Sequence, residues 1–312
     1  MPSDVFIVGE NITGLYLGIR TLEKGYSTTI VDKRFKVSSS KIPIIFTDTH
    51  YGFKKFVSKL GLSIEEIKNP LFNDNSLNQL ITKAEKLHSI LQNSLTLYQF
   101  CQSVFGKNTT RNLFNHSIME QYSQCNVMIA ISMIKKNILH QRHFILKDNQ
   151  SVILEKLRKI FKENGGITIY RCNVFKINII CNHSFSINTD KGTYKSNIVI
   201  STLKSSNVLK IYPWTTDKIE NIDSIQYINL VSRYFKTNTI LERFNIAIPD
   251  VVKPDKTHVV FKEGVDPMII YNNIKQLIAP NIHFYICNIH YSKNQGWING
   301  VIEMANDIIR SF

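Results

Sequence analysis

The beginning of the chain holds the pattern that most restricts its fold. An apolar run over residues 4–9 ends at a glycine, a helix-compatible stretch follows over 12–25, and a second apolar run over 27–32 ends in an acid. Gly9 permits a tight turn after the first run, and Gly14 allows the helix to pack closely against the strand. This order predicts a βαβ unit in a parallel sheet, of the kind that binds dinucleotides.

The chemistry of this unit explains why those residue types matter. Free N–H groups at the start of the helix, around Ile12 and Thr13, can bind a pyrophosphate, and Asp32 can accept hydrogen bonds from ribose hydroxyls. Asn11 replaces the middle glycine of the usual G-x-G-x-x-G pattern, at the point where the backbone comes nearest to phosphate. Asparagine tolerates unusual backbone angles but adds a side chain, so the fingerprint is incomplete at this position.

The net charge of the chain is strongly positive. Its 312 residues include 38 Lys and Arg against 24 Asp and Glu, a formal charge of +14. A pyrophosphate would offset only about two of these charges. The lysines are dispersed, so we identify no nucleic-acid motif, and a nucleic-acid or anionic-membrane surface stays the less favoured alternative. The abundance of Ile, Asn and Lys is typical of AT-rich coding, as in a large DNA virus or a parasite.

Length and cysteine content indicate a cytoplasmic protein of two interleaved domains. A hydrophobic content of 43% can form a substantial core, and there is no run of 18 or more apolar residues to span a membrane. Because a strand begins almost at the first residue, we expect no signal peptide. Five cysteines without CxxC spacing predict reduced thiols. The spacing of His140 and His143 permits metal binding, but a solvated pair is the simpler interpretation, and we predict no metal site.

Hydrophobic periodicity predicts the remaining elements. Apolar residues spaced i, i+3, i+4, i+7 from Phe53 predict an amphipathic helix over 49–61. The stretch 63–148 is mostly helical in pattern. Further predicted elements are helices over 149–164 and 300–311, and strands within 167–201, 225–235, 257–262 and 282–288.

Three segments together resemble the flavin-containing amine oxidase superfamily, which includes protoporphyrinogen-oxidase-like and renalase-like flavoproteins. The first segment is the N-terminal unit. The second spans residues 166–203 and contains Val-Ile-Ser-Thr202, similar to the family's V-I-x-T strand. The third, Gly296-Trp-Ile-Asn-Gly300, is similar to the family's G-W-x-x-G ending. The resemblance implies an α/β protein with a discontinuous, Rossmann-like FAD-binding domain and a reduced α+β substrate domain.

The resemblance also implies a non-covalently bound FAD. It places the ADP half at the N-terminal turn and Asp32, the adenine at the backbone of Val174, and the flavin end near residues 296–300. The implied reaction is hydride removal from a small or medium organic substrate, with no catalytic residue identified. The predicted cofactor-binding residues are Gly9, Asn11, Ile12, Thr13, Gly14, Asp32, Lys33, Arg34, Val174, Asn288, Gly296, Trp297 and Ile298.

The sequence departs from the family pattern at three further places. Arg34 is followed by Phe-Lys-Val-Ser-Ser-Ser, without the family's R-x-G-G-R glycines. The segment Tyr285-Ile-Cys-Asn-Ile289 lacks the family's Gly-Asp or Gly-Glu, and Arg233 is the nearest cation where many relatives have a lysine. With Asn11, these changes leave open a catalytically inactive fold that acts as a binding or structural module. A mutase or NAD(P)-using reductase is a third, weaker hypothesis, because a second glycine fingerprint is absent.

The three segments also predict the domain boundaries. Residues 1–62, 150–212 and 280–312 are expected to form the FAD-binding domain. Residues 63–149 and 213–279 are expected to form the substrate or cap domain. The sequence identifies neither the substrate nor the oligomeric state.

Overall fold

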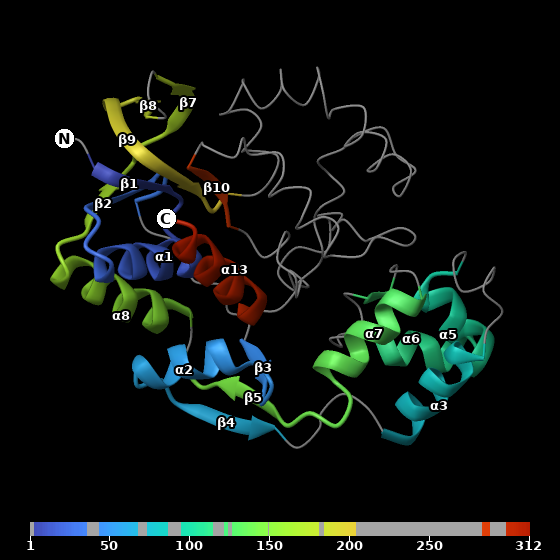
Figure 1. Cartoon of the computed structure of the whole chain (residues 1–312). Helices are drawn as coiled ribbons and strands as arrows, with labels where there is room; N and C mark the ends of the chain where they lie inside the picture. The colour runs from blue at the N-terminus through green and yellow to red at the C-terminus, as the bar shows by residue number, and fades with distance from the viewer. Residues whose placement is uncertain are drawn as a thin grey trace.

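The described part of the chain forms three groups of elements. The computed structural model describes residues 3–35, 44–67, 74–86, 95–114, 122–123, 127–148, 150–180, 184–203, 283–287 and 298–312. Figure 1 shows a large sheet with helices along one face, a small sheet beside a single helix, and a set of helices to one side.

The N-terminal unit has the predicted βαβ form. Strand β1 (Ser3–Val8), helix α1 (Ile12–Glu23) and strand β2 (Thr28–Asp32) follow one another, and the two strands pair in parallel. Alternate residues of β1 enter two cores, because successive side chains of a strand point to opposite faces. Val5 and Ile7 pack with the helices, whereas Phe6 and Val8 pack on the opposite face.

The large sheet is mostly parallel, which confirms the predicted α/β class. The strands that pair in parallel, in spatial order, are β6 (Ile167–Tyr170), β2, β1 and β9 (Gly192–Ser201), with β10 (Phe284–Ile286) on the far side of β9. An antiparallel meander extends the sheet from the first half of β9 through β8 (Phe185–Thr189) to β7 (Val174–Ile179). The carboxyl ends of β1, β2 and β9 therefore lie side by side, where ligands bind in such sheets.

Two further helices pack against α1 on one face of this sheet. They are α8 (Gln150–Glu163) and α13 (Ile298–Arg310), close to the predicted ranges (Figure 1). A Cβ atom at Gly18 of α1 would lie 2.7 Å from the ring of Phe161 in α8, so a glycine is needed for this close approach. On the other side, the Tyr16 hydroxyl donates to Asn306 Oδ1 of α13 at 2.8 Å.

The small sheet corrects one prediction. Strands β3 (Ile45–Thr47), β5 (His143–Leu146) and β4 (Ile64–Ile67) pair antiparallel beside the predicted helix, here α2 (Tyr51–Lys59). The stretch 63–148 was predicted to be mostly helical, and this is wrong at β4 and β5. Short apolar runs do not distinguish a strand from a helix, and these two pair with partners far away in the sequence, such as Ile45 with Ile145.

The predicted helical character holds between those two strands. Helices α3 (Asp74–Glu85), α5 (Leu97–Phe105), α6 (Lys107–Phe114) and α7 (Val127–Asn137) lie together in Figure 1. Helix α5 begins with a capping box, in which the Thr96 hydroxyl accepts from Gln99 N and the Gln99 side chain accepts from Thr96 N. Among the residues that the structure describes, no helix has both the length and the apolar character to cross a bilayer.

The predicted domain boundaries stay a prediction. The small sheet joins β3, from the predicted FAD-binding segment 1–62, to β4 and β5, from the predicted substrate segment 63–149. The strands predicted at 225–235 and 257–262 lie outside the described residues.

Candidate functional site

Two glycines shape the turn between β1 and α1. Gly9 has φ +107°, and a Cβ atom on it would lie 2.5 Å from Thr202 Oγ1. A Cβ atom on Gly14 would lie 2.1 Å from the carbonyl oxygen of Gly9. Side chains at either position would therefore force the turn apart, which is the physical reason for the glycines in the fingerprint.

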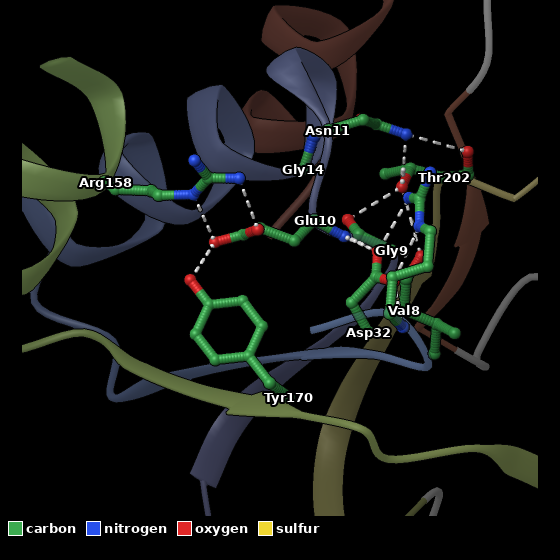
Figure 2. Close-up of polar contacts among 10 residues, drawn as sticks. Val8, Gly9, Glu10, Asn11, Gly14, Asp32, Arg158, Tyr170 and Thr202 are labelled. Atoms are coloured by element: carbon green, nitrogen blue, oxygen red, sulfur yellow. Dashed lines mark hydrogen bonds and ion pairs between the residues drawn. The ribbon is translucent and has the colours of Figure 1, made fainter. Parts of the chain in front are cut away.

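The side chain of Asn11 is bonded on both of its sides (Figure 2). Asn11 is the N-cap of α1, and its Oδ1 accepts a hydrogen bond from Gly14 N at 2.9 Å. Its Nδ2 donates to the Thr202 carbonyl oxygen at 3.3 Å and to Thr202 Oγ1 at 3.1 Å. Asn11 thus joins the turn to the residue that follows β9. It also accepts the hydrogen bond of one N–H group at the start of α1, that of Gly14, which a ligand could otherwise accept.

Asp32 lies at the end of β2 with both carboxylate oxygens bonded inside the protein. Oδ1 accepts from Arg34 N at 2.8 Å and Arg34 Nε at 2.9 Å, and Oδ2 accepts from Glu10 N at 2.8 Å and Arg34 Nη2 at 2.9 Å. Burial alone would raise the pKa of this carboxyl, but the bonds from Arg34 and Glu10 outweigh it, so the pKa is lowered. Asp32 is therefore an ionised, fully bonded group at neutral pH.

A cluster of three polar residues around one buried carboxylate supports the same turn. Glu10, between Gly9 and Asn11, has a side chain that is 0% exposed. Its carboxylate accepts from Arg158 Nε and Nη2, each at 3.0 Å, and from the Tyr170 hydroxyl at 2.6 Å. Arg158 comes from α8 and Tyr170 from the end of β6, so three elements meet at this one carboxylate (Figure 2).

A cavity opens beside the turn at the carboxyl ends of the strands. Its volume is about 280 Å³. Its wall combines the ends of β1, β2 and β9 with the residues that lead into β7. The lining residues are Val8, Gly9, Asn11, Val31, Asp32, Lys33, Arg34, Cys172, Asn173, Val174, Thr202 and Leu203.

The predicted site residues fall into three sets. Six of them line the cavity together, namely Gly9, Asn11, Asp32, Lys33, Arg34 and Val174. Ile12, Thr13 and Gly14 form the first turn of α1 next to it, and Ile298 begins α13, away from the cavity lining. Asn288, Gly296 and Trp297 lie outside the described residues.

The start of α13, where the flavin end was predicted, is tied to α2. Asn299 is buried, and its Oδ1 accepts a hydrogen bond from Phe53 N at 3.1 Å. Its Nδ2 donates to Glu303 Oε1 at 2.7 Å. In the described residues, this helix start therefore serves packing between two helices.

The sequence interpretation missed Glu10, Arg158 and Tyr170 as site residues. An acidic residue between Gly9 and Asn11 was a visible signal, because a charge in so tight a turn needs a buried partner. Nothing local indicates that the partner is Arg158, which is 148 positions away. Within the described ranges, no group of three or more His, Cys, Asp or Glu residues is arranged to hold a metal ion.

Comparison with known proteins identifies solved structures that have a similar fold. No protein-family model matches the chain, and no curated protein matches it by sequence. Among solved structures, a protein from Exiguobacterium sp. 255-15 assigned as a protoporphyrinogen oxidase aligns with TM-score 0.61 and 10% identity, over 98% of each chain. Putrescine oxidase bound to putrescine aligns with TM-score 0.60 and 10% identity, over 99% of this chain and 98% of that one.

A third similar structure is a protein of Pyrococcus furiosus, with TM-score 0.60, 11% identity, and 98% of this chain and 97% of that chain covered. At such low identity the likeness establishes the fold. The predicted resemblance to flavin-containing amine oxidases is thus confirmed for the architecture, which this chain shares with the protein assigned as a protoporphyrinogen oxidase and with putrescine oxidase.

Proposed function

We propose that this protein binds FAD non-covalently and acts as an oxidoreductase of the amine-oxidase type. The observation that supports it most strongly is the cavity at the carboxyl ends of β1, β2 and β9, which is lined by six of the residues predicted from the sequence. Ligands of open α/β sheets bind at this edge. The likeness in fold to an oxidase of putrescine supports the reaction class but not a particular substrate.

The chemistry of the cavity fits the ADP half of such a cofactor. Its volume of about 280 Å³ suits a nucleoside portion better than a whole dinucleotide. Lys33 and Arg34 are exposed cations at its wall and can neutralise a pyrophosphate, and Asp32 provides acceptors for ribose hydroxyls. Since Arg34 already bonds both oxygens of Asp32, binding requires Arg34 to exchange a carboxylate bond for a bond to the ligand.

The residues of the chain would hold and orient the cofactor, and the flavin itself would accept the hydride. Gly9 and Gly14 keep the turn close to the ligand because neither carries a Cβ atom. Val8, Val31 and Val174 give the cavity an apolar wall against which an adenine can pack. Thr202 fixes the end of β9 to the turn through bonds from its hydroxyl to the carbonyl oxygens of Val8 and Gly9.

A second candidate is a flavin-free binding or structural module. One observation favours it: the two groups that would hold the cofactor's ribose and phosphate are already bonded within the chain. Asp32 has four internal donors, and the N–H of Gly14 is capped by Asn11. Each bond given up on binding reduces the net affinity for a ligand, by about 1 kcal/mol for an ordinary hydrogen bond.

The visible absorption spectrum separates the two candidates. Purified wild-type protein is titrated with FAD beside Asp32→Ala and beside Glu66→Gln, a control that changes an exposed carboxylate outside the cavity lining. The proposal expects the spectrum of bound oxidised flavin in wild type and control, and a large loss in Asp32→Ala. A colourless wild type whose added FAD keeps its free spectrum would support the flavin-free module instead.

A further inference from the structure

Glu10 places a carboxyl group inside the turn of the candidate site, paired with a guanidinium. Its side chain is fully buried, and charged groups are buried only when they are paired and hydrogen-bonded. Both carboxylate oxygens accept from the guanidinium of Arg158, and one of them also accepts from the hydroxyl of Tyr170. Three charge-assisted bonds converge on one side chain, so its position is fixed by α8 and β6.

The electrostatics of the cluster keep each group in the form that makes these bonds. The hydrogen bond from Arg158 to Glu10 raises the pKa of the guanidinium. Burial, together with the bond to Glu10, raises the pKa of Tyr170 to about 12, so its hydroxyl stays protonated and donates. Arg158 therefore stays a cation and the Tyr170 hydroxyl stays a donor at physiological pH.

The backbone of Glu10 links the cluster to the cavity. Its N–H donates to Asp32 Oδ2 at 2.8 Å, and the next residue, Asn11, caps Gly14 and reaches Thr202. A shift of Glu10 would displace both Asp32 and Asn11. Arg158 does not line the cavity. Figure 2 shows that its bonds to the turn go to the carboxylate of Glu10.

We propose that Arg158 is a positioning residue for nucleotide binding, which holds the β1–α1 turn in its binding geometry through Glu10. This inference depends on the proposed function, because it assigns a role in binding the ADP half of the cofactor. In physical terms, α8 contributes to affinity without touching the ligand, since the Arg158 fork fixes two carboxylate oxygens at once.

The test compares three variants. Arg158→Lys keeps a cation near Glu10 but cannot span both oxygens as a planar fork. Tyr170→Phe keeps the ring and removes one bond. Lys156→Met is the matched control, because Lys156 also lies on α8 but bonds to the carbonyl oxygens of Leu60 and Gly61, away from the turn. Each protein is measured by calorimetric titration with ADP and by amide hydrogen exchange of residues 9–14 without ligand.

The proposal expects Arg158→Lys to bind ADP about tenfold more weakly than wild type, as loss of one charged hydrogen bond would give. It also expects faster amide exchange in residues 9–14 of this variant. In Tyr170→Phe, ADP affinity and exchange should change in the same directions but by less. In Lys156→Met, ADP affinity and exchange should equal those of the wild type. Wild-type affinity and exchange in Arg158→Lys, even with a lower unfolding midpoint, would show a purely structural role and overturn the inference. A wild type that does not bind ADP would overturn the proposed function and the inference with it.

Discussion

The β1–α1 turn and the small sheet use the same types of charged residue in opposite ways. Glu10 in the turn and Asp32 beside it have side chains that are 0% and 3% exposed, and each accepts at least three hydrogen bonds. In the small sheet, Glu66 pairs with Arg142 and Glu65 with Lys147 on the surface, where all four side chains are about half exposed. Buried carboxylates fix backbone geometry, whereas exposed pairs are screened by water and ions.

The largest effect is expected from breaking the cluster around the buried Glu10. Glu10→Ala leaves Arg158, whose side chain is only 19% exposed, without its carboxylate partner. Removing one partner of a buried pair costs about 3 kcal/mol or more, so we expect the free energy of unfolding in urea to fall by that amount. Glu10→Gln, which keeps the shape and one acceptor, should lose less. Equal and small losses in both variants would contradict the contrast between turn and small sheet.

The second effect concerns Asp32 and its pH dependence. Asp32→Asn removes the charge from four bonds and should cost about 2 kcal/mol at pH 7. The pKa of Asp32 is lowered in the folded protein, so its stabilisation is present above the unfolded value near 4 and is lost as pH falls through the folded pKa. Urea unfolding at several pH values checks this.

The difference in unfolding free energy between wild type and Asp32→Asn should be largest near neutral pH and shrink steadily below pH 4. The surface carboxylates titrate in both proteins and cancel in this difference. A gap between the two proteins that is independent of pH would argue that Asp32 stabilises the turn by shape alone.

The third variant, Asn11→Gly, is expected to lower the stability of the protein and to raise its affinity for FAD. Asn11→Gly restores the fingerprint glycine, and a glycine N-cap costs only a few tenths of a kcal/mol relative to asparagine. The variant also loses the hydrogen bonds from the side-chain amide to Thr202, which adds about 1 kcal/mol. The change frees the N–H of Gly14 for a phosphate and removes a side chain from the cavity wall. We therefore expect lower stability and tighter FAD binding, measured by quenching of flavin fluorescence. Weaker FAD binding in this variant would mean that Asn11 contacts the cofactor directly.

The smallest effect is expected in the small sheet. Arg142→Gln removes the exposed pair with Glu66 and a cation over the ring of Phe144. Because both charges are solvated, we expect no measurable change in the urea midpoint or in FAD binding. A loss of unfolding free energy as large as that of Glu10→Ala would contradict the account. It would mean that buried and exposed ion pairs contribute equally to the stability of this protein.

The sequence predicted those parts of the site that depend on neighbouring residues. Gly9, Gly14 and Asp32 belong to one βαβ unit, whose turn and helix leave a local pattern of spacing. The resemblance to the family added Val174 as a residue that contacts the adenine, and Val174 lines the same cavity as Gly9 and Asp32. The architecture was therefore predictable despite the low identity to solved structures.

Long-range partners could not be predicted in this way. Asn11 was interpreted as a lost phosphate contact, and the structure adds that its side chain bonds to Thr202, 191 positions away. Likewise, β5 is a strand because β3 and β4 pair with it, not because His143–Leu146 has a distinctive local pattern. In both cases tertiary contacts, absent from any short window of sequence, determine what the residues do.

Calorimetric titration of the wild type with ADP and, separately, with FMN tests the central claim most directly. ADP is the half of the cofactor assigned to the cavity, and FMN carries the flavin without it. The account predicts saturable ADP binding that Asp32→Ala abolishes, and much weaker binding of FMN. ADP binding that is absent, or that is unchanged in Asp32→Ala, would contradict the assignment of this cavity.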